Sequence, residues 1–168
     1  MMKILNVVTL PVVNKKDKLE GLIVTGDIAK SYMDVYDNCI LSTAKTSYKN
    51  ILETLDAKMI VGSEDGFFES GEVVIATANP DVLEDYIHPG DMVILGNRYE
   101  TQLCAIEMGA ACVVISMGAK VSKTIQHFAK EHNCIVINTP YDSFTVARLI
   151  NQSMSIGSVS YTHLRAHE

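Results

Sequence analysis

The sequence predicts an α/β fold with a mainly parallel β-sheet. In the second half of the chain, three short segments are apolar at every position: residues 92–95, 112–115 and 134–137. Strands that are covered on both faces have this composition, because neither face meets water. Each segment is followed by a polar loop and by a stretch with helical hydrophobic periodicity, which is the usual connection between parallel strands.

The chain begins with a predicted β-hairpin followed by a helix. Residues 7–13 and 21–25 are rich in valine, leucine and isoleucine, and the polar run 14–18 between them supplies the turn. Behind Asp27, a typical helix N-cap residue, apolar side chains recur with helical spacing through Tyr36. Two strands and one helix of this size cannot bury a core alone, so we expect this segment to be part of a larger unit.

The middle of the chain alternates helix and strand patterns. Thr46 is the expected N-cap of a helix whose apolar side chains recur at spacings of three and four residues. Short strands are predicted at 59–61 and 73–76, separated by an acidic loop rich in glycine and serine at 62–71. The Asn-Pro pair at 79–80 predicts a further helix start. The alternation extends the α/β arrangement toward the N-terminus.

Composition excludes several classes of function. The chain has 168 residues, of which 48% are hydrophobic and 20% charged, and a net charge of −6. A net negative charge argues against a nucleic-acid surface, because neutralising phosphates requires lysine and arginine. No apolar run approaches the roughly 18 residues or more of a membrane helix. We therefore expect a cytoplasmic protein without a nucleic-acid or membrane partner.

Residue types common in hydrolytic, redox or metal sites have simpler explanations here. The four cysteines lack Cys-x-x-Cys spacing, and the favoured interpretation is small buried hydrophobic residues, with a metal site or disulfide as the alternative. His127 and His132 lie five residues apart on a predicted helix, which does not bring both to one metal. The sequence contains no phosphate-loop, dinucleotide-binding or His-Glu-x-x-His motif. We expect no catalytic residue, metal ligand or cofactor in this chain.

Residues 159–168 look like the translation of a sequencing-library adapter. We expect residues 157–168 to be a non-native tail outside the fold, and a genuine polar tail is the alternative. The His-x-x-x-His spacing of His163 and His167 is then not a metal site.

The loops that follow the three apolar strands carry a family resemblance. The first holds Asn97 and Arg98, the second holds Ser116, Met117 and Gly118, and the third begins the run Thr-Pro-Tyr-Asp-Ser-Phe-Thr. This arrangement resembles the DRTGG domain, which is named for an Asp-Arg pair in the first loop and a Thr-Gly-Gly in the second. Arg98 and Gly118 match that signature. Asn97, Ser116 and Met117 stand in place of its Asp, Thr and first Gly.

The resemblance implies a DRTGG-type three-layer domain over residues 41–156. In sheets of this kind, ligands bind beyond the carboxyl ends of the strands, so the signature loops are the place to look for one. Arg98, beside a predicted helix N-terminus, would suit a phosphate or carboxylate. The alternative is an ion pair between Arg98 and a carboxylate of Glu100, Glu107 or Asp142.

Residues 1–40 resemble the C-terminal half of a CBS (cystathionine-β-synthase-type) domain. The matching features are Leu-Pro-Val-Val at 10–13, a turn, and a run of glycine and hydrophobic residues that leads to Asp27. The resemblance implies nucleotide binding by Thr25 and Asp27, with the carboxylate accepting hydrogen bonds from a ribose. Val24 occupies the position of the family's threonine, and Thr25 lies one residue later. Asp27 as a helix cap alone is the alternative.

A partial CBS domain that runs directly into a DRTGG domain resembles the regulatory region of manganese-dependent family II inorganic pyrophosphatases. The resemblance implies a homodimer that binds an adenine nucleotide (AMP, ADP, ATP or a diadenosine polyphosphate) and controls a catalytic domain. The Asp-His-His motif of that family's Mn²⁺ site is absent from this chain. Two other hypotheses are a DRTGG dimerisation or interaction module without a ligand, and a small stand-alone α/β enzyme.

Overall fold

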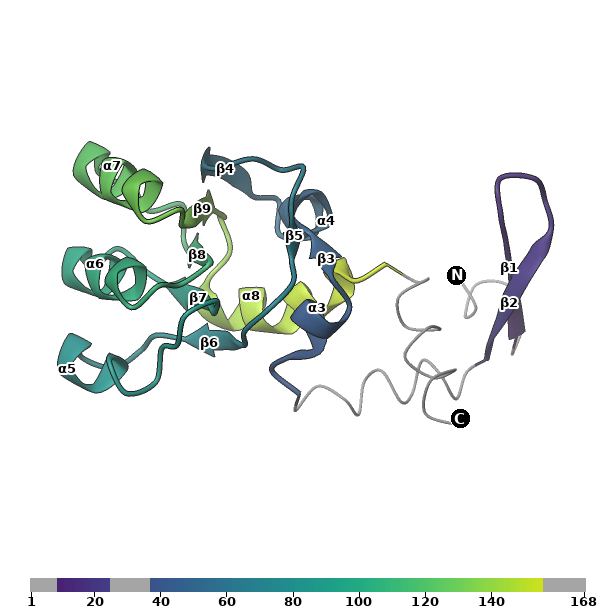
Figure 1. The fold of residues 1–168 in the computed structure, drawn as a ribbon, viewed down its shortest axis with the longest axis horizontal. Helices are drawn as coiled ribbons and strands as arrows, with labels where there is room; N and C mark the ends of the chain where they lie inside the picture. Colours follow the sequence, from purple (N-terminus) through teal and green to yellow (C-terminus); the bar gives the residue numbers. More distant parts are fainter. Residues whose placement is uncertain (1–8, 25–36, 156–168) are drawn as a thin grey trace.

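The structure is a computed structural model that describes residues 9–24 and 37–155 (Figure 1). In chain order its elements are β1 (Thr9–Val13), β2 (Leu19–Val24), α3 (Ile40–Thr43), β3 (Thr46–Ser47), α4 (Tyr48–Thr54), β4 (Lys58–Val61), β5 (Phe67–Phe68), β6 (Val73–Ile75), α5 (Pro80–Leu83), β7 (Met92–Leu95), α6 (Tyr99–Glu107), β8 (Cys112–Ile115), α7 (Lys123–Glu131), β9 (Ile135–Asn138), α8 (Ser143–Leu149) and the 3₁₀ helix η2 (Ile150–Ser153). This mixed α/β architecture confirms the fold class that the sequence predicts.

β1 and β2 form the predicted antiparallel hairpin. The amide of Asn14 donates to the carbonyl of Lys18, and Oδ1 of Asn14 accepts from the amide of Lys18. Asp17 takes the left-handed conformation in this turn, with φ 55°, a region that aspartate tolerates better than most residues. The helix predicted behind Asp27 lies outside the described residues.

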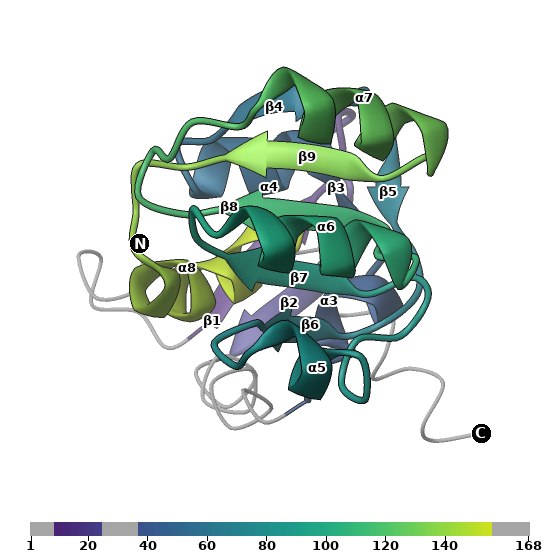
Figure 2. The ribbon, with the colours of Figure 1, turned by 90° about the vertical axis from the view of Figure 1, so that its left-hand side faces the viewer.

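The α/β domain is built on a five-stranded sheet with the order β4-β9-β8-β7-β6. β6, β7, β8 and β9 are parallel and adjacent in chain order, whereas β4 joins the sheet antiparallel beside β9. Because each crossover moves one strand along in the same direction and crossovers share one hand, α5, α6 and α7 lie on the same face (Figure 2). α3, α4 and α8 lie on the other face, which gives three layers (Figure 1).

The two faces of the sheet bury separate hydrophobic clusters. Successive residues of a strand point to opposite faces, so Val93 and Leu95 join the cluster formed with α5, α6 and α7, whereas Met92 and Ile94 join the cluster formed with α3, α4 and α8. All four side chains of β7 are buried, as are all four of β8. Burial on both faces explains why these strands are apolar at every position.

Some predicted boundaries are wrong. Ser47, not Thr46, is the N-cap of α4, and its hydroxyl accepts from the amide of Asn50 at 3.2 Å. Thr46 instead belongs to β3, where its buried hydroxyl donates to the carbonyl of Leu41 at 2.9 Å. The predicted loop 62–71 contains β5, which pairs antiparallel with β3. A strand of two residues is too short for periodicity to reveal it.

Candidate functional site

The loops that follow β8 and β9 meet at the carboxyl edge of the sheet. β8 leads to α7 on one face, and β9 leads to α8 on the opposite face (Figure 2). In open α/β sheets, a crevice forms where connections from adjacent strands leave toward opposite faces, and ligands bind there. Residues 116–118 and 139–143 are therefore the first place to test for a ligand site.

Backbone hydrogen bonds between these two loops occupy that position. The amide of Met117 donates to the carbonyl of Tyr141 at 2.7 Å, and the amide of Gly118 donates to the carbonyl of Thr139 at 2.8 Å. Amides that point at a ligand are what a phosphate site requires. Here these two amides already donate to carbonyls of the loop after β9, so they do not point at a ligand.

Ser116 joins the same loops through its side chain. It is 2% exposed, and its Oγ lies 3.0 Å from the carbonyl oxygen of Leu95 and 3.1 Å from Oγ of Ser143. A hydroxyl has one hydrogen, so Ser116 can donate to the carbonyl while it accepts from Ser143. Ser116 stands where the DRTGG signature has threonine, and either residue supplies this hydroxyl.

The second signature loop depends on two successive left-handed residues. Met117 has φ 60° and Gly118 has φ 61°. Glycine adopts this conformation freely, whereas a residue with a Cβ atom loses roughly 1–2 kcal/mol. The glycine pair of the signature therefore suits the sharp turn between β8 and α7. At Met117, a strained backbone presents a side chain that is 74% exposed.

Thr139 connects the third loop to the layer of α4. Its buried hydroxyl donates to the carbonyl of Leu55 at 2.6 Å and accepts from the amide of Tyr141 at 3.2 Å. At the end of β9, Nδ2 of Asn138 donates to the carbonyl of Ala119 at 2.6 Å. These contacts give the Thr-Pro-Tyr run a structural role that its local sequence does not reveal.

The first signature loop is exposed to solvent. Asn97 and Arg98 are exposed, and Arg98 is the N-cap residue of α6 without a side-chain capping bond. Nε2 of Gln102 donates to the carbonyl of Gly96 at 2.9 Å, which ties the loop to α6. In the described part of the chain, no carboxylate lies within ion-pair distance of Arg98. Its guanidinium is therefore available to an anion, and the alternative, an ion pair with Glu100, Glu107 or Asp142, is not formed there.

Asp142 is the N-cap of α8. Its Oδ1 accepts from the amides of Phe144 and Thr145 at 3.0 Å, and its Oδ2 accepts from Oγ1 of Thr145 at 2.6 Å. These hydrogen bonds hold the pKa of the Asp142 carboxyl below its usual range. The bond from the Thr145 hydroxyl has the largest effect, and the bonds from the amides add to it. The Arg148 guanidinium lies 5.6 Å from the centroid of the Phe144 ring, in a cation–π contact.

Replacing Thr145 with valine should raise the pKa of the Asp142 carboxyl toward its ordinary value, because the largest cause of the lowering is removed. A lowered pKa in the folded state means that Asp142 adds stability above its unfolded pKa, and this contribution is lost as the pH falls through the folded pKa. NMR titration of the carboxyl carbon measures the shift. Thr124→Val, at an exposed threonine of α7, is the control, and an unchanged Asp142 titration in Thr145→Val would contradict the assignment.

Three of the four cysteines are buried, in agreement with the sequence interpretation, whereas Cys39 departs from it because it is only partly buried. Cys104, Cys112 and Cys134 are free thiols, and burial raises the pKa of Cys134 to about 12.

The described residues show neither a metal site nor a membrane helix. Nε2 of His127 lies 3.4 Å from Oε1 of Glu131 on the same helix. Within residues that the structure describes, no three histidine, cysteine, aspartate or glutamate side chains are grouped as a metal would require. In the same part of the chain, no helix has the length and apolar character to cross a membrane.

The two predicted nucleotide-binding residues, Thr25 and Asp27, lie outside the described residues. β2 ends at Val24, immediately before them, so the hairpin leads directly into that predicted site. The other predicted site consists of the DRTGG signature loops, and hydrogen bonds join the second of these loops to the third. In the described part of the chain, no hydrogen bond connects the side chain of Asn97 or Arg98 to either of these loops.

The fold and the signature loops define a three-layer α/β domain that follows a β-hairpin segment. The chain belongs to the DRTGG domain family, because the sequence model of that family matches residues 50–153. It is homologous to the regulatory CBS–DRTGG region of a pyrophosphatase from Clostridium perfringens. These findings confirm the resemblance on which the sequence interpretation rests.

Two curated relatives and one solved structure carry this conclusion. The "Cobalt-dependent inorganic pyrophosphatase" of Clostridium perfringens (strain 13 / Type A) is 38% identical over 154 residues, which are 92% of this chain and 28% of that protein. The "Probable manganese-dependent inorganic pyrophosphatase" of Thermotoga maritima is 30% identical over 88% of this chain and 27% of that protein. The chain thus spans little more than a quarter of either relative.

The solved structure contains the CBS and DRTGG domains of the regulatory region of Clostridium perfringens pyrophosphatase, complexed with the activator diadenosine tetraphosphate. Its similarity to this chain has a TM-score of 0.84 and 38% sequence identity, and it covers 94% of this chain and 69% of that one. The similarity therefore extends over nearly the whole chain.

Proposed function

We propose that this chain is part of the regulatory region of a metal-dependent inorganic pyrophosphatase, in which an adenine nucleotide bound by the N-terminal part controls a catalytic domain outside this chain. The observation that carries the proposal is the similarity, at a TM-score of 0.84 over 94% of the chain, to a regulatory region complexed with diadenosine tetraphosphate. An identity of 38% over that length supports a shared order of domains and a shared type of ligand.

The nucleotide would bind through Thr25 and Asp27 in a partial CBS domain formed by residues 1–40. A carboxylate offers two oxygen atoms, so Asp27 can accept hydrogen bonds from both vicinal hydroxyls of a ribose. A threonine hydroxyl can donate to a phosphate oxygen. AMP, ADP, ATP and diadenosine polyphosphates all contain the adenosine group that this arrangement would recognise.

The proposed parent enzyme is a cytoplasmic homodimer with a catalytic domain that uses Mn²⁺ or Co²⁺. The names of the two curated relatives specify cobalt and manganese, which supports metal dependence. In such a domain the metal would lower the pKa of a bound water and make it a nucleophile near neutral pH. The chain described here would supply regulation, not the residues of that site.

A second proposal is that the DRTGG domain at residues 41–156 is a dimerisation or interaction module without a ligand, and the loop contacts support the absence of a ligand at its second signature loop. Backbone amides of Met117 and Gly118 donate to carbonyls of the neighbouring loop, so they are not directed at a ligand. The nucleotide would then bind only in the N-terminal part, and the DRTGG domain would link that part to the rest of the enzyme. Residues 157–168 would take no part in either role.

Titration calorimetry with AMP should show binding to this chain no tighter than about millimolar, equivalent to roughly 4 kcal/mol. Half of a CBS domain lacks the surfaces that would close a pocket around the nucleotide, and preorganisation and desolvation decide affinity more than the number of contacts does. Asp27→Ala should abolish the heat of binding. Arg98→Ala, a matched loss of one exposed charge in the DRTGG domain, should leave it unchanged.

Three outcomes would change this conclusion in different ways. Micromolar binding that Asp27→Ala abolishes would show that the half domain is sufficient. Micromolar binding that Arg98→Ala abolishes would move the nucleotide to the first signature loop. No heat of binding at any concentration would contradict nucleotide sensing by this chain.

A further inference from the structure

The start of α6 presents backbone amides that have no partner. α6 is nine residues long, and its N-cap residue, Arg98, supplies no side-chain capping bond. The amides of Tyr99, Glu100 and Thr101 donate to no part of the chain that the structure describes. At α7 and α8, in contrast, the N-cap side chain accepts from amides of the first turn. Three free donors therefore lie at the positive end of the α6 dipole.

The side chain of Thr101 adds a polar group without a partner. Thr101 is 3% exposed, and its buried Oγ1 forms no hydrogen bond with any described residue. A threonine in a helix often bonds to the carbonyl three or four residues earlier, but this hydroxyl does not. A buried hydroxyl without a partner is destabilising, and an acceptor oxygen brought by a ligand would remove that cost.

The direction of Thr101 follows from Cys104, which lies on the same face of α6. Sγ of Cys104 lies 3.9 Å from the carbonyl oxygen of Pro80, the first residue of α5, and α5 and α6 lie side by side (Figure 2). Residues three apart share a helix face, so Thr101 faces the same neighbour one turn nearer the start of α6. Helical side chains lean toward that end. The hydroxyl therefore faces the first turn of α6 and the loop after β6.

Gly96 leaves room beside this turn. A Cβ atom added at Gly96 would meet nothing within 4 Å, and the backbone there is not left-handed. The carbonyl of Gly96 accepts from Nε2 of Gln102 at 2.9 Å, which holds the loop against α6. The exposed guanidinium of Arg98 adds a positive charge two residues later. Glu100, an exposed carboxylate in the first turn, is the group that opposes an anion here.

We propose that the start of α6, with Gly96, Arg98 and Thr101, is a binding site for a phosphate group. Amides at a helix start and a guanidinium are the donors that phosphate oxygens accept. Together with the Thr101 hydroxyl they exceed the roughly four acceptor positions of a carboxylate, which favours phosphate. The site is distinct from the one proposed at Thr25 and Asp27. Free phosphate and a nucleotide both carry this group.

NMR titration of the full chain with inorganic phosphate tests the site, at low ionic strength to limit screening. The amide signals of residues 99–101 should shift until the site is saturated. Arg98→Ala and Thr101→Val should each weaken phosphate binding about tenfold, because each removes a hydrogen bond to a charged group. Arg148→Ala and Thr124→Val make the same replacements at exposed residues elsewhere and should leave the affinity unchanged.

Thermal unfolding without phosphate separates binding from a structural role. Thr101→Val removes an unpartnered hydroxyl and keeps the shape of the side chain, so the melting temperature should stay the same or rise. Gly96→Ala fills the space beside α6 without an overlap, so the fold should be retained while phosphate affinity falls. A lower melting temperature of Thr101→Val with unchanged phosphate affinity would show that the hydroxyl serves the fold alone, and would overturn the site.

Titration with AMP identifies the source of the phosphate group. Shifts of residues 99–101 at about tenfold lower concentrations of AMP than of phosphate would assign the site to a nucleotide. Equal or weaker shifts would assign it to free phosphate, which we expect because the groups assembled here contact only a phosphate. No saturable shift with either compound would overturn the inference and leave the DRTGG domain as a module without a ligand. Calorimetry with Asp27→Ala tests the N-terminal site independently.

Discussion

Replacing Gly71 with alanine should destabilise the α/β domain by roughly 3 kcal/mol, the sum of a left-handed backbone cost and an overpacking cost. Gly71 has φ +85°, which penalises any residue with a Cβ atom. The added Cβ would lie 2.3 Å from the carbonyl oxygen of Gly90 and 2.7 Å from the amide nitrogen of Asp91. These are backbone atoms, so no side-chain rotation relieves the overlap. The start of β6 would have to move away from β7.

Gly118→Ala is the matched control for this substitution. Gly118 also has a left-handed backbone, with φ +61°, but its added Cβ would meet nothing within 4 Å. It should therefore lose only the conformational part, about 1 kcal/mol. Urea unfolding of the two variants measures the difference between them. Equal losses in free energy of unfolding would show that the close approach of Gly71 to Gly90 does not limit the fold.

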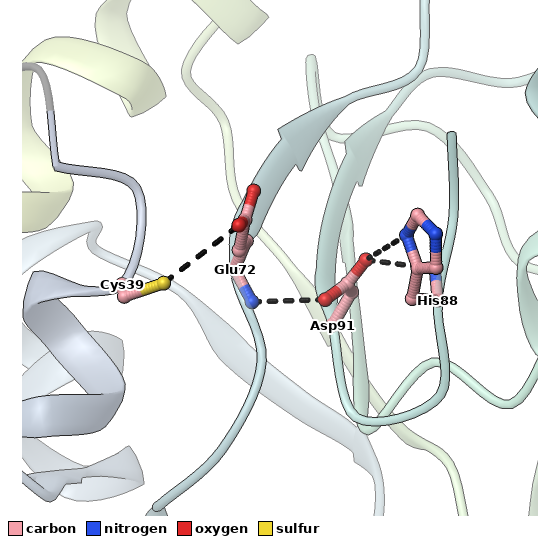
Figure 3. Close-up of polar contacts among 4 residues, drawn as sticks. All are labelled: Cys39, Glu72, His88 and Asp91. Atoms are coloured by element: carbon pink, nitrogen blue, oxygen red, sulfur yellow. Dashed lines mark hydrogen bonds and ion pairs between the residues drawn. The ribbon is translucent and has the colours of Figure 1, made fainter.

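The Asp91→Ala variant should lose roughly 2–5 kcal/mol, because two backbone amides would lose the acceptor that the buried carboxylate provides. The Asp91 side chain is 3% exposed. Its Oδ1 accepts from the amide of Glu72 at 2.9 Å, and its Oδ2 accepts from the amide of His88 at 2.8 Å (Figure 3). One carboxylate thus joins the start of β6 to the turn before β7. Without it, both backbone segments lose this partner, and the two parts of the chain lose their connection.

Three further variants separate this effect from others in urea unfolding. Asp91→Asn keeps one oxygen acceptor and should lose less stability than Asp91→Ala. His88→Ala should change stability by less than about 1 kcal/mol, because the His88 side chain is 74% exposed and its contact with Asp91 is 3.9 Å long. Asp85→Ala, at an exposed aspartate, should stay within about 0.5 kcal/mol. A loss in Asp91→Ala no larger than in Asp85→Ala would contradict the role of the carboxylate.

The second DRTGG signature loop has a clear physical role in this chain. Its left-handed residues turn the amides of Met117 and Gly118 toward the loop after β9. The hydroxyl of Ser116 adds a side-chain link between the same loops. The signature sequence therefore builds a rigid carboxyl edge of the sheet. Arg98, which also belongs to the signature, is exposed and takes no part in these contacts.

Much of the fold could be predicted because buried strands and helix faces require apolar residues at regular spacings, and these spacings can be recognised in the sequence. β7 and β8 are apolar at every position since both faces of the sheet are covered. The hairpin around Asn14 follows from a polar turn between apolar runs. The signature loops were placed correctly after their strands for the same reason. The prediction of the α4 cap at Thr46 was wrong because Ser47, the adjacent residue, has an equally suitable hydroxyl.

The sequence by itself determined the longer strands, most of the helices, their α/β order and the family to which the chain belongs, but not the two-residue strands β3 and β5. Only the tertiary structure decided the partners of single polar groups. The hydroxyl of Thr139 bonds to the carbonyl of Leu55, which is 84 residues away, and the carboxylate of Asp91 bonds to the amide of Glu72, 19 residues away. Apolar periodicity extends over many residues and can be recognised locally, whereas one hydroxyl or carboxylate has the same local sequence whether it meets water, a ligand or the chain itself. Its partner is set by the packing of the sheet and its helices.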